Sequence, residues 1–122
     1  MLKLSSIMIG TMQPEVMAKF YEAVFDKKPD MVDGKWSGWN TEGAFISIGE
    51  HSEMGGMTKD PGRVMFVLDA KDVKAEFERI KAIEGAKVVK DPYEMGGMWI
   101  ATLADPDGNY FQLMNPWDAS QM

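Results

Sequence analysis

The sequence predicts an α+β fold in which two βαβββ modules form a cup-shaped mixed sheet with helices on its outer face. Three observations predict it. A strand pattern and an amphipathic helix open the chain, a second strand and helix follow near residue 63, and each pair precedes three short strand patterns. A chain of 122 residues has the size of one compact domain. We therefore expect a single domain over 1–122, with modules at 3–50 and 62–116.

The first module is predicted to begin with a strand at 3–11 and a helix that starts at Pro14. Proline suits the first helical turn, because its fixed φ fits the helix and its missing N–H has no helical partner there. Apolar residues then recur at spacings of three and four, as in a helix with one buried face. These residues are Val16, Met17, Phe20, Tyr21 and Val24. We expect the helix to end near Phe25–Asp26, where aspartate tolerates a left-handed cap conformation.

Residues 28–49 are predicted to form a short meander. Turn residues at 29–30 and 33–34 separate the strand patterns, which lie at 36–40 and 44–49. The predicted order of the first module is therefore βαβββ.

The second module is predicted to start with a strand at 63–68, an apolar run suited to a strand covered on both faces. Asp69 is a candidate N-cap for the next helix, with Asp72 three residues later. The buried stripe of this helix is predicted to be Val73, Phe77, Ile80 and Ile83. Gly85 is the predicted end of the helix, because glycine readily adopts the left-handed cap conformation.

Three more strands are predicted at 87–90, 99–104 and 110–114. The last two are joined by Asp-Pro-Asp-Gly-Asn at 105–109, a strong hairpin turn in which proline presets φ and glycine accepts a positive φ. The second module is therefore also βαβββ.

The pentapeptide EMGGM occurs twice, at 53–57 and 94–98. Aligning the two helices through Phe20 and Phe77 gives the modules an offset of 57 residues, whereas the two pentapeptides start 41 residues apart. They therefore occupy different places in their modules and are not the trace of a duplication. We expect the glycine pair to provide flexibility or a tight bend in each loop, with the methionines packing on apolar surface.

Composition and charge limit the possible functions. The net charge of −6 disfavours nucleic acid and anionic membranes as partners. No segment approaches the roughly 18–20 apolar residues of a membrane span. The chain has no cysteine, which excludes disulfides, thiolate chemistry and cysteine-ligated zinc. We expect a soluble, cytoplasmic protein. Its twelve methionines are either core filler or the lining of a pocket.

Three sequence segments carry a resemblance that spans nearly the whole chain. They are FYEAVF at 20–25, VLDAKDVKAEFERI at 67–80 and LADPDGNYFQLMNP at 103–116. Together with the two βαβββ units, they resemble the vicinal oxygen chelate superfamily, which includes the glyoxalase I, bleomycin-resistance, fosfomycin-resistance and extradiol-dioxygenase families. The resemblance implies a small-molecule ligand and a homodimer. It does not name a function, because this fold hosts lyases, isomerases, dioxygenases, transferases and drug-binding proteins.

The resemblance also implies where a divalent metal would be held. Metal-using relatives take ligands from the first, fifth and eighth strands, often with one from the fourth. The corresponding residues here are Ser6, Arg63 and Gln112, with Ile46 and Ser47 near the fourth-strand position. None is a good ligand, and an arginine repels a cation because it stays protonated. We therefore expect neither a metal nor another cofactor.

The segment Glu50-His51-Ser52-Glu53 contains the single histidine of the chain. It is either a solvated polar loop or an improvised metal site, and the tight spacing on a loop favours the solvated loop.

A mostly apolar wall with a few polar groups is predicted for the concave face of the sheet, as in many ligand pockets. Strand alternation assigns to this wall Leu4, Ser6, Met8, Arg63, Met65, Val67, Tyr110, Gln112 and Met114. The alternate residues Ile7, Ile9, Val64, Phe66, Leu68, Phe111 and Leu113 are expected to pack under the helices. Arg63 is expected either to bind a ligand carboxylate or phosphate or to form an internal salt bridge.

Other aromatic and methionine residues extend this prediction. Trp36, Trp39 and Trp99 are each either core or ligand wall, and Met54, Met57, Met95 and Met98 are candidates for a mobile rim.

The sequence thus favours a metal-independent protein that binds or sequesters a largely apolar, aromatic or cationic compound. A glyoxalase-like lyase or isomerase with atypical metal ligands, or another enzyme of the superfamily, is the first alternative. A metal-free catalyst would use Arg63, Tyr110 or Glu50. A homodimeric module without a ligand is the second alternative.

Overall fold

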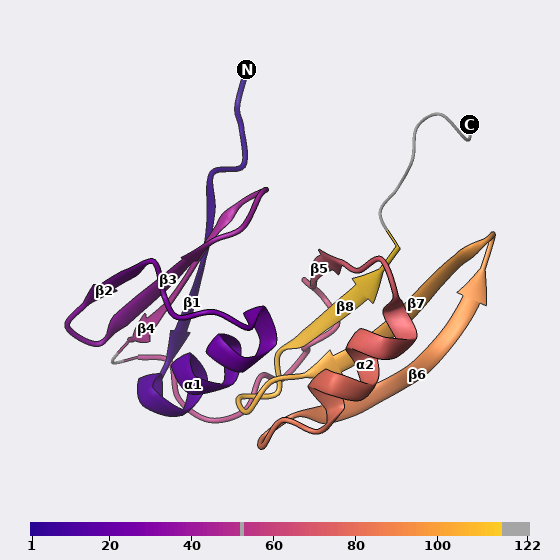
Figure 1. The fold of residues 1–122 in the computed structure, drawn as a ribbon. Helices are drawn as coiled ribbons and strands as arrows, with labels where there is room; N and C mark the ends of the chain where they lie inside the picture. Colours follow the sequence, from indigo (N-terminus) through magenta and orange to yellow (C-terminus); the bar gives the residue numbers. More distant parts are fainter. Residues whose placement is uncertain (52, 116–122) are drawn as a thin grey trace. The chain divides into compact units, whose positions relative to one another are not determined.

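The computed structural model describes residues 1–51 and 53–115, and it contains two compact units (Figure 1). These units, Met1–Gly56 and Met57–Met122, are called the first and second modules below. Each contains one helix and one four-stranded mixed sheet, in the order βαβββ. The predicted fold class, α+β with two βαβββ modules, is confirmed. Ser52 and Pro116, which fall within the predicted polar loop and the second module, lie outside the described residues.

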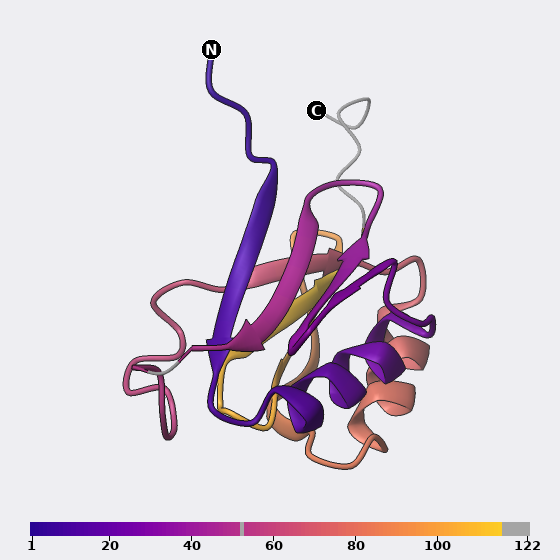
Figure 2. The same ribbon diagram turned by 90° about the vertical axis from the view of Figure 1, so that its left-hand side faces the viewer.

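The first module contains β1 (Ser6–Thr11), α1 (Pro14–Phe25), β2 (Met31–Asp33), β3 (Trp36–Asn40) and β4 (Phe45–Glu50). Its strand order is β1-β4-β3-β2, in which β1 runs parallel to β4 and the other neighbours are antiparallel. The chain leaves β4 beside the C-terminal end of β1 (Figure 2). The predicted meander is confirmed, and the first strand starts at Ser6 rather than at residue 3.

The second module contains β5 (Phe66–Asp69), α2 (Val73–Lys81), β6 (Lys87–Met95), β7 (Met98–Ala104) and β8 (Tyr110–Met114). Its strand order is β5-β8-β7-β6, again with one parallel pair, β5 and β8. The two sheets therefore have the same topology. The predicted fifth strand at 63–68 starts too early, and the sixth extends to Met95 rather than ending at Lys90.

The pairing registers show which strand residues of the two modules are equivalent. Aligning β4 and β8 from their first residues makes Ser47 equivalent to Gln112. Ser47 pairs with Met8, and Gln112 pairs with Val67. Met8 and Val67, which are 59 residues apart, are therefore equivalent.

This register corrects the predicted counterpart of Ser6. Met8 is equivalent to Val67, so the residues two positions earlier, Ser6 and Met65, are also equivalent. Ser6 therefore does not correspond to Arg63. The buried residues of the helices follow a different offset, of 56 residues: Met17 with Val73, Tyr21 with Phe77, and Val24 with Ile80. The predicted match of Phe20 with Phe77 is therefore wrong. A constant offset fails because α2 has no counterpart to the first turn of α1.

The ends of the helices follow local chemistry. Pro14 occupies the start of α1, and Asp26 caps its C-terminus with a left-handed φ of 54°, as predicted. The N-cap of α2 is Asp72, whose Oδ1 accepts a hydrogen bond from the Ala75 N–H at 3.1 Å. The prediction of Asp69 as N-cap is wrong, because Asp69 still belongs to β5. Since α2 ends at Lys81, Gly85 lies beyond the helix.

Each helix packs on one face of the sheet in its own module, α1 on β4 and α2 on β6, β7 and β8. The fully buried side chains of the second module include Phe77, Phe111 and Leu103. The predicted alternation is confirmed for Phe111 and Leu113, which are buried on the helix side. It is wrong for Val64, which is 84% exposed because β5 begins only at Phe66.

The two EMGGM segments form different structures. The copy at 94–98 is the β6–β7 hairpin turn, and its Gly96 and Gly97 have φ values of 60° and 83°. Two successive positive φ values are typical of a type I′ turn, which favours glycine. The copy at 53–57 follows β4 and has one glycine with positive φ, Gly56. Their different positions in the two modules are confirmed.

Candidate functional site

The face of each sheet opposite its helix is called the open face. On the first sheet it comprises Ser6, Met8 and Gly10 of β1, Phe45, Ser47 and Gly49 of β4, and Trp36, Gly38 and Asn40 of β3. Met8 is 69% exposed. The predicted wall residues Ser6 and Met8 are thus on one face, and Ser47, rather than the buried Ile46, is the β4 residue beside them.

Two aromatic rings cover glycines on this open face. A methyl group at Gly49 would lie 2.0, 2.3 and 2.5 Å from three ring atoms of Trp36. A methyl group at Gly38 would lie 2.3 Å from Cζ and 2.7 Å from Cε1 of Phe45. The three Trp36 atoms include Cδ2, which lies inside the ring system and is the nearest, so the indole lies face-on over Gly49. The two Phe45 atoms lie on the rim of its ring. Trp36 and Phe45 are half-buried, so part of each ring is accessible.

The open face of the second sheet is mostly apolar. It comprises Val67 of β5, Tyr110, Gln112 and Met114 of β8, and Ile100, Thr102 and Ala104 of β7. Two polar side chains on this face are joined by a hydrogen bond: the Gln112 side-chain amide donates to the Thr102 hydroxyl at 3.2 Å. The predicted wall residues Tyr110, Gln112 and Met114 therefore lie together on one strand face.

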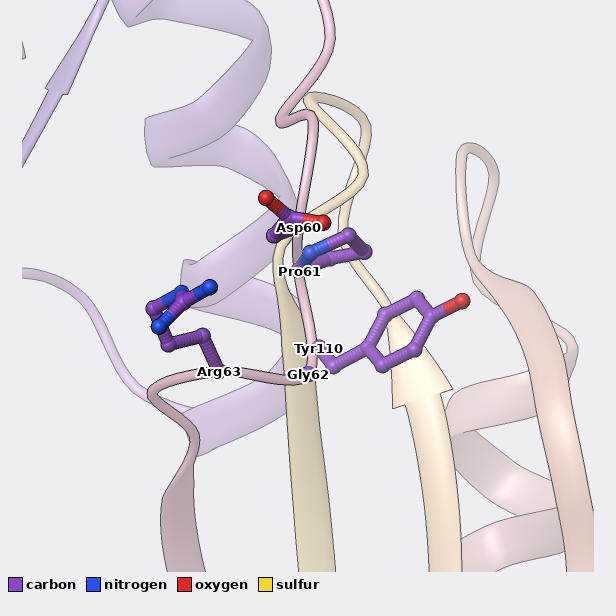
Figure 3. Close-up of a pocket in the computed structure, with 5 residues that line it drawn as sticks. All are labelled: Asp60, Pro61, Gly62, Arg63 and Tyr110. Atoms are coloured by element: carbon purple, nitrogen blue, oxygen red, sulfur yellow. The ribbon is translucent and has the colours of Figure 1, made fainter.

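A pocket of about 470 Å³, open to solvent, lies where the chain approaches β5. Its lining residues are Asp60, Pro61, Gly62, Arg63 and Tyr110 (Figure 3). The Tyr110 ring packs beside the Gly62 backbone, because a methyl group at Gly62 would lie 3.7 Å from its Cδ2. Figure 3 shows Arg63 and Tyr110 on opposite sides of this loop, so they do not converge on one small group.

The loop that carries this pocket is attached to the β7–β8 turn. The Thr58 N–H donates to the Asp107 carbonyl at 3.1 Å, and the Thr58 hydroxyl donates to Asn109 Oδ1 at 2.5 Å. Arg63 itself is exposed and forms no ion pair within residues 1–51 and 53–115. The predicted internal salt bridge of Arg63 is therefore not found in this part of the chain.

Two of the three predicted wall tryptophans lie elsewhere. Trp39 is fully buried on the helix side, where its indole N–H donates to the Lys27 carbonyl at 3.0 Å. Trp99 also lies on the helix side of its sheet, with Lys74 Nζ of α2 3.9 Å from its ring centroid. Strand alternation turns both away from the open faces, which fits the core alternative for Trp39. Trp36 is the tryptophan of the three on an open face.

The four predicted rim methionines lie in three different segments of the chain. Met54 lies beside Gly10 in the first module, and Met57 lies beside Gly108 at the β7–β8 turn. Met95 and Met98 pair across the hairpin at the other end of β7. These side chains therefore belong to separate places on the chain.

The residues at the predicted metal positions do not fit a divalent metal centre. They offer hydroxyls, a guanidinium, a thioether and an amide, whereas such a centre uses imidazole and carboxylate ligands. In the described part of the chain, no three His, Cys, Asp or Glu side chains are grouped as metal ligands. In the polar loop around His51, Glu50 instead forms an ion pair of 2.8 Å with Lys35. We derive no reaction step through a metal from these positions.

Sequence reasoning missed Phe45, Gly38, Gly49 and Thr102 on the open faces. The signal for the first three was a glycine on each of two adjacent strands with an aromatic residue near it on the neighbouring strand. Trp36 is directly opposite Gly49, and Phe45 is diagonal to Gly38. Recognising this signal requires the pairing register of the strands, which the sequence does not give.

The paired βαβββ modules with open sheet faces define a glyoxalase-type fold, consistent with the vicinal oxygen chelate superfamily. The chain belongs to the glyoxalase-like domain family, whose model matches residues 6–114. No match is found among curated proteins. Among the described residues, no helix is both long enough and apolar enough to cross a membrane.

Several solved structures share the fold. A glyoxalase-related enzyme from Fulvimarina pelagi is 19% identical with a TM-score of 0.79, over 98% of this chain and 94% of that chain. A glyoxalase/bleomycin resistance protein from Albidiferax ferrireducens T118 is 18% identical with a TM-score of 0.73, over 92% and 98%. A glyoxalase/bleomycin resistance protein/dioxygenase family enzyme from Burkholderia phytofirmans PsJN is 26% identical with a TM-score of 0.72, over 93% and 98%. The first two likenesses concern the fold alone.

Proposed function

We propose that this protein binds a small, largely apolar, aromatic or cationic compound without a metal, and sequesters it rather than transforming it. The observation that carries the proposal is the half-buried Trp36 ring, which lies face-on over Gly49 on the open face of the first sheet. A ring held flat against a glycine is positioned before any ligand arrives, so stacking on it costs little side-chain entropy.

The surroundings of Trp36 support a ligand of this class. Phe45 and Met8 share its open face and add aromatic and thioether surface. The net charge of −6 attracts cations at long range, and aromatic rings attract them at contact. In the second module, the pocket that Arg63 lines supports a separate contact, with a carboxylate or phosphate group.

A thermal-shift screen with planar aromatic compounds, both cationic and neutral, tests this proposal. A ligand present at 100 times its Kd raises the stability by about 2.7 kcal/mol, which is a measurable increase in Tm. For a compound that raises Tm, we expect Trp36→Leu to weaken binding by about tenfold or more, as loss of one aromatic contact predicts. The matched control, Trp99→Leu, removes a tryptophan from the helix side and should leave the affinity unchanged.

Two outcomes contradict the proposal. One is a screen in which no compound raises Tm, or in which both tryptophan variants weaken binding equally. The other is stoichiometric zinc, nickel, iron or manganese in protein purified without chelators, which would restore the lyase or isomerase alternative.

We also propose that the two modules form one domain, that the chain pairs as a homodimer, and that it acts in the cytoplasm. Exposed apolar residues on the strand faces, including Met8 and Val67, support the homodimer because water contact with such surface is unfavourable. Sedimentation velocity showing only monomer at micromolar concentration would contradict the pairing.

A further inference from the structure

The chain after β4 folds back onto the end of β1. The His51 N–H donates to the Thr11 carbonyl at 3.1 Å, and the Met54 N–H donates to the His51 carbonyl at 3.1 Å. The second hydrogen bond closes a tight turn. It brings the single histidine of the chain close to the methionine of the first EMGGM segment.

Gly10 of β1 provides the space in which these two side chains lie. A methyl group at Gly10 would be 3.0 Å from His51 Cβ and 3.2 Å from Met54 Cγ. A methyl group at Gly55, the next residue after Met54, would be 3.3 Å from Met12 Cγ. The carbon stems of His51 and Met54 therefore lie over Gly10, and that of Met12 lies beside Gly55, the residue that follows Met54. Together, Met12, His51 and Met54 are called the Met–His cluster below.

The Met–His cluster is on the surface rather than in the core. Met12 is 56% exposed, Met54 is 49% exposed, and His51 is also exposed. Burial of apolar surface therefore does not explain why two methionines lie beside the histidine. An ion can reach the sulfur of an exposed thioether directly from solvent.

The donor set selects one class of ion. Thioethers are soft ligands that favour Cu(I), and imidazole also binds copper. Hard divalent ions prefer oxygen ligands, and Glu50, the nearest carboxylate before the turn, is paired with Lys35 at 2.8 Å. The acidic net charge attracts any cation to the surface. We propose that the Met–His cluster is a binding site for Cu(I). It lies over Gly10, the β1 partner of Gly49, and therefore borders the aromatic site on the same open face.

The imidazole provides an internal reporter of binding. His51 Nδ1 accepts a hydrogen bond of 3.2 Å from the Glu53 N–H, so Nε2 carries the proton of the neutral ring. Binding through Nε2 requires the proton to move to Nδ1, and binding through Nδ1 occupies the accepting lone pair. Both routes break the hydrogen bond from Glu53, so its amide resonance must change.

Titration with Ag(I), a redox-inert monovalent ion of similar softness, tests the site, and Cu(I) under anaerobic conditions repeats the test. The readouts are the methyl resonances of the methionines and the amide resonance of Glu53. We expect the Met12 and Met54 methyls and the Glu53 amide to shift first and to saturate together at one equivalent. Met54→Leu and His51→Gln should each weaken binding by about tenfold or more, as the loss of one of three ligands implies.

The second EMGGM segment supplies the matched control. Met95 is 60% exposed but lies in the β6–β7 hairpin, in a module whose sequence contains no histidine. Met95→Leu should leave the affinity for Ag(I) unchanged. Equal shifts of the Met95 and Met54 methyls, or full affinity in Met54→Leu, would overturn the proposal. Leucine is close to methionine in volume, so this variant is expected to fold.

Discussion

The two modules share one strand order and one pairing register, yet they fill equivalent positions on their open faces with different side chains. Gly49 of β4 is equivalent to Met114 of β8, and Gly38 of β3 is equivalent to Thr102 of β7. The first module places aromatic rings over its glycines, whereas the second carries its own side chains at the same places. The backbone arrangement is therefore kept while the chemistry of the surface changes, which is why the fold alone does not give the function.

The turns before β4 and β8 also share one backbone arrangement but differ in their side chains. Thr41 and Asp105 each follow directly after the preceding strand, and each side chain accepts a hydrogen bond from the N–H two residues later. The Thr41 hydroxyl has a second bond, to the Ala44 carbonyl at 2.5 Å. The Asp105 carboxylate is fully buried and accepts further bonds from Asn109. The same turn design is thus reinforced in the second module by a charged group.

The largest expected effect is a difference in stability between variants of these two turns. Asp105→Ala removes a buried carboxylate and leaves the N–H groups of Asp107 and Asn109 without an acceptor. Hydrogen bonds to charged groups contribute more than neutral ones, so we expect the free energy of unfolding to fall by about 3 kcal/mol. Thr41→Val in the first module should cost about 1 kcal/mol or less. Urea denaturation measures both values.

Asp105→Asn is the matched control, since it keeps one side-chain oxygen as acceptor and should retain more stability than Asp105→Ala. Equal losses in Asp105→Ala and Thr41→Val would show that the charge contributes nothing to the turn.

A smaller effect tests the aromatic cover of the first open face. Gly49→Ala places a methyl group where the Trp36 ring lies, 2.0 Å from its nearest atom. The ring must move, and overpacking of this kind costs about 1–3 kcal/mol. We also expect the Trp36 fluorescence to shift to longer wavelength as the ring becomes more exposed. The control is Gly43→Ala, where the nearest atom to the new methyl is 3.8 Å away.

If Gly49→Ala proves as stable as the natural chain and its fluorescence is unchanged, the ring does not lie over Gly49. The proposed aromatic site would then lose its main support.

The sequence predicted the order of elements well, because periodicity is a local property. The stripe of α1 and the turn at 105–109 depend on residues close together in the chain, and both are found in the structure. The exception is Val16, which was predicted in the stripe but is 49% exposed. The start of β5 was placed three residues early, because the apolar run 63–68 does not show which residues pair with β8. Pairing joins segments far apart in sequence, and local patterns do not encode its register.

The candidate site was less predictable for the same reason. The inward or outward direction of Trp39 and Trp99 depends on where β3 and β7 begin and on their registers. The Trp36 ring covers Gly49 from a neighbouring strand, so this contact cannot be predicted from the sequence around either residue alone. By contrast, Tyr110, Gln112 and Met114 were placed on one face correctly, since alternation within a single strand was enough.

The smallest expected effect concerns the edge strands, where β2 has three residues and β6 has nine. The chain entering β2 is held by Asp30, whose Oδ2 accepts bonds from Lys27 Nζ at 2.8 Å and the Asn40 N–H at 2.7 Å. These bonds, from Lys27 first, lower the pKa of the Asp30 carboxyl below its usual 3.8. Because the folded-state pKa is depressed, the stabilisation is present above the unfolded-state pKa and is lost as the pH falls through the folded-state pKa.

Carboxyl resonances followed from pH 6 to pH 2 by NMR give the pKa of Asp30 directly. In Lys27→Gln we expect this pKa to rise toward 3.8, because the charged donor is gone while the Asn40 N–H remains. Lys19→Gln, which changes the net charge of the module by the same amount at a position in α1, should leave the pKa of Asp30 almost unchanged. Both lysines are exposed, and Lys27 is the one that donates a hydrogen bond to Asp30. An equal rise in both variants would therefore assign the lowered pKa to the general field of the module rather than to the bond that holds its short edge strand.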